Sequence, residues 1–219
     1  MILAAAVCPH PPGLPPQVGL GLPELEPTRI AAADAVAALL ESDPSRVVVI
    51  GPDEHPVDAD ESAAGSFAGF GVDLVVGGPG VRLPAAYAVG AWLLDEAGWD
   101  GPRRYTSATP NPGDRDVLLV LADADTAVGV SAPTHGDPRA AALESVITTA
   151  LADADATTLA ALDPETAREW QGTGVAPLRL LGELVTDETA KGASVTARLR
   201  SDETPFGVRY WVASWSLTR

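Results

Sequence analysis

Two of the three histidines in this chain directly follow apolar runs, and each could bind a metal ion. His10 comes just after the run at 2–7, and His55 comes after the run at 46–50, with acidic residues immediately before it. Histidine is the commonest metal ligand in proteins, and a rigid loop at the end of a strand can hold one in place. Two histidines and one carboxylate would give the facial arrangement of non-haem Fe(II) centres, which leaves positions open for oxygen and substrate.

The same histidines also have ordinary structural interpretations. His10 could pack on its neighbouring prolines or hydrogen-bond a carbonyl group, and His55 could be an exposed loop residue among acids. His135 stands immediately before a predicted helix, where Asp137 is suited to capping. Cys8 is interpreted as a buried strand residue, although its closeness to His10 permits a thiolate. Spacing alone therefore does not choose between a metal site and a structural role.

The elements that would hold these residues alternate along the chain. Apolar runs predict strands at 2–7, 46–50, 72–76, 116–121, 194–199 and 208–214. Helices are predicted at 24–41, 84–98, 139–152, 164–171 and 176–185. This alternation predicts a single α/β domain over 1–219, with a central mostly parallel or mixed sheet and helices on both faces. Ligands of such sheets bind beyond the carboxyl ends of the strands, which is where His10 and His55 are predicted to lie.

Three finer expectations follow from the same patterns. The runs at 2–7 and 47–50 are uninterrupted, so we expect two adjacent inner strands. The acidic stretch at 53–71 is expected to be a surface loop. The helix at 24–41 is expected to bury one apolar face, which contains Ile30, Val36, Ala37 and Leu40.

Composition excludes some classes of partner. The formal net charge is -16, from 14 Lys and Arg against 30 Asp and Glu, so nucleic acid and anionic membranes are not expected as partners. No apolar run approaches the ~18 residues that a membrane span needs. A single cysteine rules out a disulfide within the chain. We therefore expect a cytoplasmic protein with a possible small-molecule ligand, and the sequence indicates no oligomeric state.

The opening segment 2–12, ILAAAVCPHPP, resembles the start of the B-subunit-type domain of class III extradiol dioxygenases. In that family a first strand leads into a Pro-His-x-Pro loop that carries the first iron-binding histidine. The segments at 81–99, 159–164 and 205–215 are similar to an actinobacterial branch of that superfamily. The resemblance covers nearly the whole chain, and its motifs are mostly structural.

The resemblance implies a non-haem Fe(II) enzyme that opens catechol-like rings, with His10 as the first iron ligand. The second family histidine directly follows a strand, whereas His55 is displaced by two residues. The family's acid/base histidine has no counterpart in the loop at 122–127, which offers only Asp123 and Asp125. The third ligand, a glutamate, has no clear match near 174–178. The expected metal ligands are thus His10 and His55 with Fe(II), and the alternative is a divergent, non-catalytic protein that binds a metal or a small molecule on the same fold.

Overall fold

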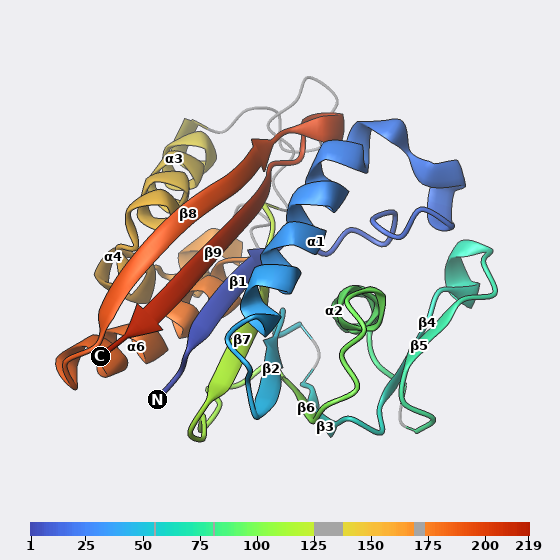
Figure 1. Ribbon diagram of the computed structural model, residues 1–219. Helices are drawn as coiled ribbons and strands as arrows, with labels where there is room; N and C mark the ends of the chain where they lie inside the picture. The colour runs from blue at the N-terminus through green and yellow to red at the C-terminus, as the bar shows by residue number, and fades with distance from the viewer. Residues whose placement is uncertain (55, 81, 125–137, 169–173) are drawn as a thin grey trace.

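A seven-stranded mixed sheet forms the centre of the protein in the computed structural model, which describes residues 1–54, 56–80, 82–124, 138–168 and 174–219 (Figure 1). The strand order is β3-β6-β2-β7-β1-β9-β8. Four inner strands run parallel to one another: β6 (Arg103–Thr106), β2 (Arg46–Ile50), β7 (Asp116–Leu121) and β1 (Ala4–Cys8). The remaining strands pair antiparallel with their neighbours: β3 (Asp58–Asp60), β9 (Tyr210–Thr218) and β8 (Ser194–Glu203).

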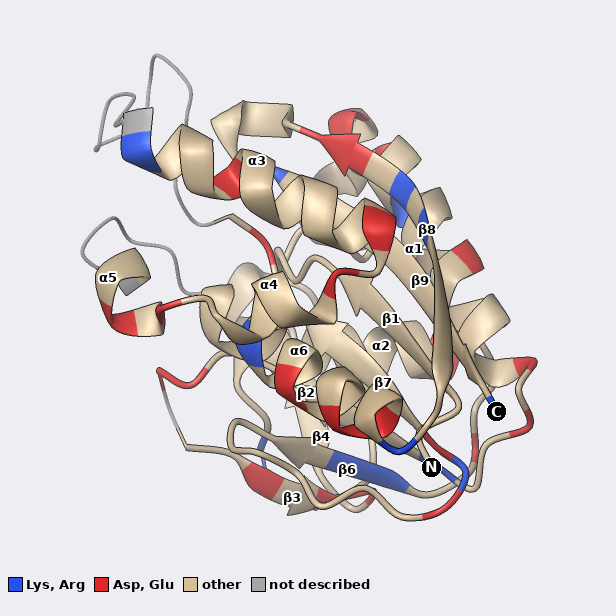
Figure 2. Ribbon diagram, turned by 90° about the vertical axis from the view of Figure 1, so that its left-hand side faces the viewer, with Lys and Arg blue, Asp and Glu red and all other residues tan. Residues whose placement is uncertain are grey.

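Helices cover both faces of this sheet. One face packs against α1 (Glu26–Leu40) and α2 (Ala85–Glu96), and the other packs against α3 (Pro138–Asp153), α4 (Ala156–Ala160) and α6 (Val175–Ala190) (Figures 1 and 2). The short helix α5 (Pro164–Arg168) precedes α6. The predicted α/β class, with a mixed sheet covered on both sides, is confirmed.

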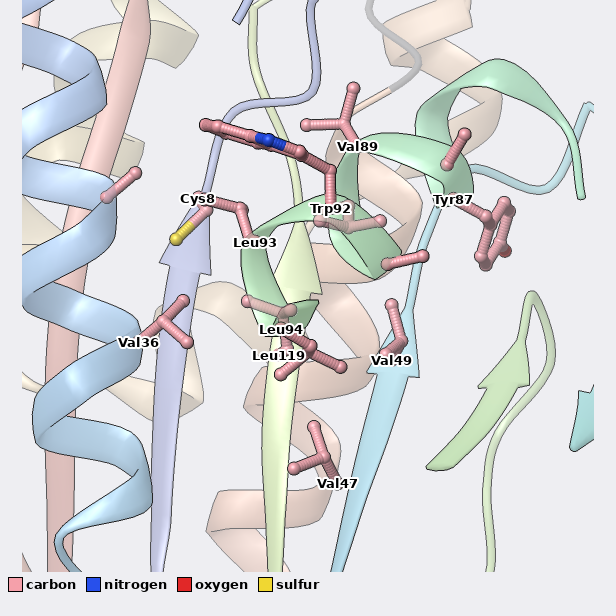
Figure 3. Close-up of a cluster of buried hydrophobic side chains, with 14 of the residues drawn as sticks. Cys8, Val36, Val47, Val49, Tyr87, Val89, Trp92, Leu93, Leu94 and Leu119 are labelled. Carbon is pink, nitrogen blue, oxygen red and sulfur yellow. The ribbon is translucent and has the colours of Figure 1, made fainter. Parts of the chain in front are cut away.

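The central strands are buried on both faces because helices cover the sheet on each side. Every residue of β1 and β7 is buried. Val49 and Leu119 belong to the core under α2, together with Leu93 and Leu94 of that helix (Figure 3). The alternate residues Val48 and Leu118 belong to the core on the other face. Such two-sided burial explains why these segments read as continuous apolar runs rather than as alternating patterns.

The predicted neighbours 2–7 and 47–50 are both inner strands, but the prediction that they are adjacent is wrong. β7 lies between them and pairs in parallel with each, for example through Val120, which is opposite Val7 on one side and Ile50 on the other. The sequence holds three strands of this buried type, and apolar character alone does not specify their order.

The stretch at 53–71, predicted as a surface loop, contains more structure than expected. It includes β3 and the strand β4 (Ala64–Ser66), which pairs with β5 (Val75–Gly77) in a separate two-stranded sheet. Of the strand expected at 72–76, only the last two residues are in a strand, β5, which belongs to this small sheet. β4 packs closely on α2, since a Cβ atom at Gly65 would lie 2.4 Å from that of Ala88.

The first long helix buries only part of the predicted face: Val36 is buried, and Leu40 packs partly buried against the core. Ile30 is 55% exposed and Ala37 is exposed, whereas Arg29 is buried. The Nε of Arg29 donates to the Leu14 carbonyl at 2.7 Å, and its guanidinium also pairs with Glu26. A buried, hydrogen-bonded arginine thus occupies part of the inner face, and the next residue, Ile30, is exposed. Among the described residues, no helix combines the length and the apolar character needed to cross a membrane.

Candidate functional site

The carboxyl ends of β1 and β7 bring together two loops that are far apart in the sequence. The parallel ladder runs from Ala4 opposite Val117 to Cys8 opposite Leu121, and the Ala122 N–H extends it by donating to the Cys8 carbonyl at 3.0 Å. Two residues beyond each strand, the chain places His10 on one loop and Asp123 on the other. This edge of the sheet is where ligands of such folds bind.

His10 and Asp123 contact each other across 113 residues of sequence. The backbone N–H of His10 donates to Asp123 Oδ2 at 3.2 Å, which fixes the carboxylate against the His10 loop. The other carboxylate oxygen, Oδ1, lies 3.5 Å from Nε2 of the imidazole. The Asp123 side chain is 4% exposed and that of His10 is 12% exposed. The pair is therefore almost entirely removed from water.

Neither of the two facing atoms has a hydrogen-bond partner. His10 Nε2 and Asp123 Oδ1 are both buried and unpaired among the described residues, because their mutual approach does not meet hydrogen-bond geometry. Buried polar atoms without partners are costly, and in native structures they are explained by strain, a catalytic role, or a bound water or ion. Two ligand atoms each ~2.1 Å from one ion can be at most ~4.2 Å apart, so the 3.5 Å separation fits two ligands of a shared ion.

The helix α6 begins directly against the Asp123 backbone. A Cβ atom at Gly174, the residue before this helix, would lie 2.0 Å from the Asp123 carbonyl oxygen. The side-chain-free residue therefore allows α6 to approach the loop after β7. The Ala124 N–H also donates to the Arg209 carbonyl at 2.9 Å, so the loop is held on both sides of its carboxylate residue.

The loop after β2, which leads to His55, is positioned by Tyr87 of α2. A Cβ atom at Gly51 would lie 2.7 Å from Cζ of the Tyr87 ring, so the ring packs directly on the backbone at the end of this strand. The Tyr87 hydroxyl lies 3.1 Å from the Pro52 carbonyl and 3.0 Å from that of Thr106, and it donates to these acceptors. Burial raises the pKa of Tyr87 well above its ordinary range, which keeps the hydroxyl protonated and able to donate.

Cys8 does not take part in this site as a thiolate. Its side chain lies in the core among Val36 and Leu93 (Figure 3). Burial raises the pKa of the Cys8 thiol to about 12, although the positive charge of Arg200 opposes the effect. The thiol therefore stays protonated at neutral pH, and the possibility of a thiolate beside His10 is not supported.

A small pocket of about 290 Å³ opens beyond the carboxyl ends of β2 and β6. Ser107 and Thr109 line it from the loop after β6, and Arg179 lines it from α6, where it pairs with Glu183 at 2.9 Å. The carboxylates that line the pocket are Asp53, Asp163, Glu165 and Glu183. The pocket is therefore predominantly acidic, and it is the second feature at this edge of the sheet that could receive a small molecule.

The structure places only part of the predicted ligand set. His10 lies at the carboxyl edge of the sheet as expected, whereas His55 and His135 fall outside the described residues, so the prediction that His10 and His55 line one pocket stays a prediction. Within the described ranges, no three side chains of His, Cys, Asp or Glu gather closely enough to hold a metal ion.

Asp123 is the residue whose place in the site was not predicted. The sequence marked it as a proton acceptor in a loop without histidine, not as the partner of His10. The signal that could have revealed it is the pairing of β1 with β7, because parallel neighbours end at the same edge. In comparisons with known proteins, no family model matches the chain and no curated protein matches it.

Proposed function

We propose that this chain binds a divalent metal ion through His10 and Asp123, and that it is a divergent protein of the class III extradiol dioxygenase type that does not open catechol rings efficiently. The observation that carries the proposal is the buried, unpaired approach of His10 Nε2 to Asp123 Oδ1 at 3.5 Å. Imidazole nitrogen and carboxylate oxygen are the donor types of non-haem Fe(II) sites. Fe(II) bound there would supply the ability to bind oxygen and an aromatic diol together.

The orientation of the Asp123 carboxylate fits a metal ion. One of its oxygens accepts from the His10 backbone N–H, and the other lies 3.5 Å from His10 Nε2 without hydrogen-bond geometry. The chain thus fixes one oxygen of Asp123 and leaves the other facing the imidazole, as two ligands of one ion require.

The expectation of weak ring opening rests on proton transfer. A positioned acid/base group typically contributes about 10²–10⁴-fold in rate. The resembled family places a histidine in the loop that here reads Ala122-Asp123-Ala124-Asp125. In the proposed site Asp123 is a metal ligand, so it is not available to carry the substrate proton.

Metal binding is tested on protein purified without chelators, by elemental analysis and by titration with Co(II), whose absorption spectrum reports its ligands. We expect one equivalent of metal, with His10→Ala and Asp123→Asn each weakening binding at least about tenfold, in the range seen when groups of a metal site are lost. Asp73→Asn is the matched control, because this exposed carboxylate lies in a loop far from the β1–β7 edge in sequence. Equal metal affinity in all three variants would refute the site.

Ring opening is tested by adding air to anaerobic Fe(II)-loaded protein with catechol or protocatechuate. We expect no rapid appearance of the yellow ring-opened product. Rapid product formation that is abolished by His10→Ala would show a working dioxygenase and overturn the second half of the proposal, while leaving the metal site intact.

A further inference from the structure

A groove lies on the part of the sheet that no described helix covers. Helices α3, α4 and α6 lie over the middle and the β8 side of this face, while β6 and β3 are open at the far edge (Figure 2). A groove of about 570 Å³ runs along this open face. Its lining comes from β2, β3, β6 and the loops that adjoin them. The volume falls within the ~300–1,000 Å³ range of small-molecule sites.

Two arginines face this groove from neighbouring strands. In the β2–β6 register Val48 is opposite Arg104, and Arg46 precedes Val48 by two residues, so both arginines point to the same face of the sheet. Their side chains are 35% and 41% exposed, respectively, so their guanidinium groups can be reached by a ligand. The chain has only 14 basic residues against 30 acidic ones, so two arginines at one groove depart from its generally acidic character.

Both guanidinium groups keep unused donors. Arg46 directs Nε and Nη2 to a single oxygen of Asp116, at 3.2 and 2.5 Å, and Arg104 directs Nη2 to Asp58. Among the described residues, Nη1 of Arg46 and Nε and Nη1 of Arg104 have no acceptor. Asp116 is buried beneath the groove at 3% side-chain exposure, so it orients Arg46 without facing a ligand. Among the described residues that line the groove, Asp58 is the one carboxylate, and its side chain is 71% exposed.

The rest of the lining suits an anion that carries an apolar body. Polar side chains from the loop after β6 add donors, and apolar groups provide the wall. The polar residues are Ser107, Thr109 and Asn111, and the apolar ones are Val48, Pro56, Val57, Ala108 and Pro110. Ser107 and Thr109 also border the acidic pocket at the carboxyl edge, so carboxylates limit how far a negatively charged ligand extends in that direction.

We propose that this groove binds a small organic anion, a carboxylate or a phosphate ester with an apolar body, through the guanidinium groups of Arg104 and Arg46. The proposal is independent of the metal site, because it uses other residues and the open face of the sheet. Arginine forms paired, charge-assisted hydrogen bonds with such anions, and the neighbouring hydroxyl and amide groups complete the donor set.

Benzoate and its neutral analogue benzamide are the probes, with binding measured by calorimetric titration and by the shift in Tm. We expect benzoate to bind about tenfold more tightly than benzamide, since charge-assisted hydrogen bonds are roughly twice as strong as neutral ones. Arg104→Gln should remove most of that difference. Arg115→Gln is the matched control, since Arg115 is also an exposed arginine paired with an exposed aspartate, Asp43, outside the groove.

A second variant predicts a change of the opposite sign. Asp58→Asn releases Arg104 from its ion pair and removes the only carboxylate among the described residues of the groove lining, so it should strengthen benzoate binding. The proposal is overturned if benzamide binds as well as benzoate, if Arg115→Gln weakens binding as much as Arg104→Gln, or if Asp58→Asn has no effect. Benzoate binding does not depend on the metal site, so the His10→Ala protein, which is expected to bind metal poorly, should give the same results in these experiments.

Discussion

Gly51 occupies a position in which a single methyl group is not tolerated. The Tyr87 ring lies on its backbone, and an added Cβ atom would be 2.7 Å from Cζ. We predict that Gly51→Ala lowers the free energy of unfolding by about 1–3 kcal/mol, the usual cost of overpacking a well-filled core. Urea unfolding measures this. Gly69→Ala is the control, because a Cβ atom there would meet nothing within 4 Å. Equal stability of the two variants would contradict the close packing of Tyr87.

Of the two residues that form the candidate site, the sequence could predict only one. His10 is recognisable because an apolar run ends directly at prolines, which places it at a strand end. Asp123 is not recognisable as its partner, since the contact joins residues 113 positions apart and depends on which buried strand pairs with which. Local pattern carries no information about that choice, and the acidic composition offers many equivalent carboxylates.

The short helix α4 begins at a single capping side chain. Asp155 accepts from the Thr158 N–H at 2.9 Å and from the Thr158 hydroxyl at 2.6 Å. These hydrogen bonds, the hydroxyl first, lower the pKa of the Asp155 carboxyl below its ordinary value of 3.8. Because the folded-state pKa is the lower one, the stabilisation is complete above pH 3.8 and is lost as the pH falls through the folded-state value.

We therefore predict that Asp155→Ala costs about 1 kcal/mol at pH 7, the typical cost of removing an N-cap. The difference from the unmodified protein should shrink as the pH is lowered below about 3.8. Thermal unfolding followed by circular dichroism across this pH range provides the measurement. Asp73→Ala should change stability little at either pH, since this exposed residue has no hydrogen bond among the described residues. A difference that stays constant with pH would count against the capping role.

Elements with strong local patterns were predicted well, and elements defined by tertiary contacts were not. The helix α2 and the strand β7 appear close to their expected bounds because an apolar face or run specifies each. The strand β6 reads RRYT and was not predicted, since its arginines form ion pairs that only the folded chain brings together. The buried face of α1 was predicted only in part for a similar reason, because Arg29 finds backbone carbonyl acceptors that the helical pattern does not indicate.

For the molecule as a whole, alternation of element types predicted the α/β class correctly, while strand order depended on long-range pairing. The remaining property at this scale is charge. Thirty acidic residues against fourteen basic ones leave a net charge of -16. Self-repulsion of this kind destabilises the compact state, because unfolding moves the charges apart. The exposed ion pairs, such as that of Arg115 with Asp43, offset little of it.

Salt should therefore stabilise this protein. Raising the NaCl concentration from about 10 to about 150 mM shortens the screening length from roughly 30 to roughly 8 Å, which weakens repulsion between distant carboxylates. The partly buried pair of Arg46 with Asp116 is screened much less, so the balance favours the folded state. We predict a rise in Tm over this range, measured by scanning calorimetry at pH 7, and a smaller rise at pH 4, where part of the carboxylates are protonated. A Tm that falls with salt at pH 7 would mean that attractive ion pairs, not the net charge, dominate the electrostatic free energy of folding.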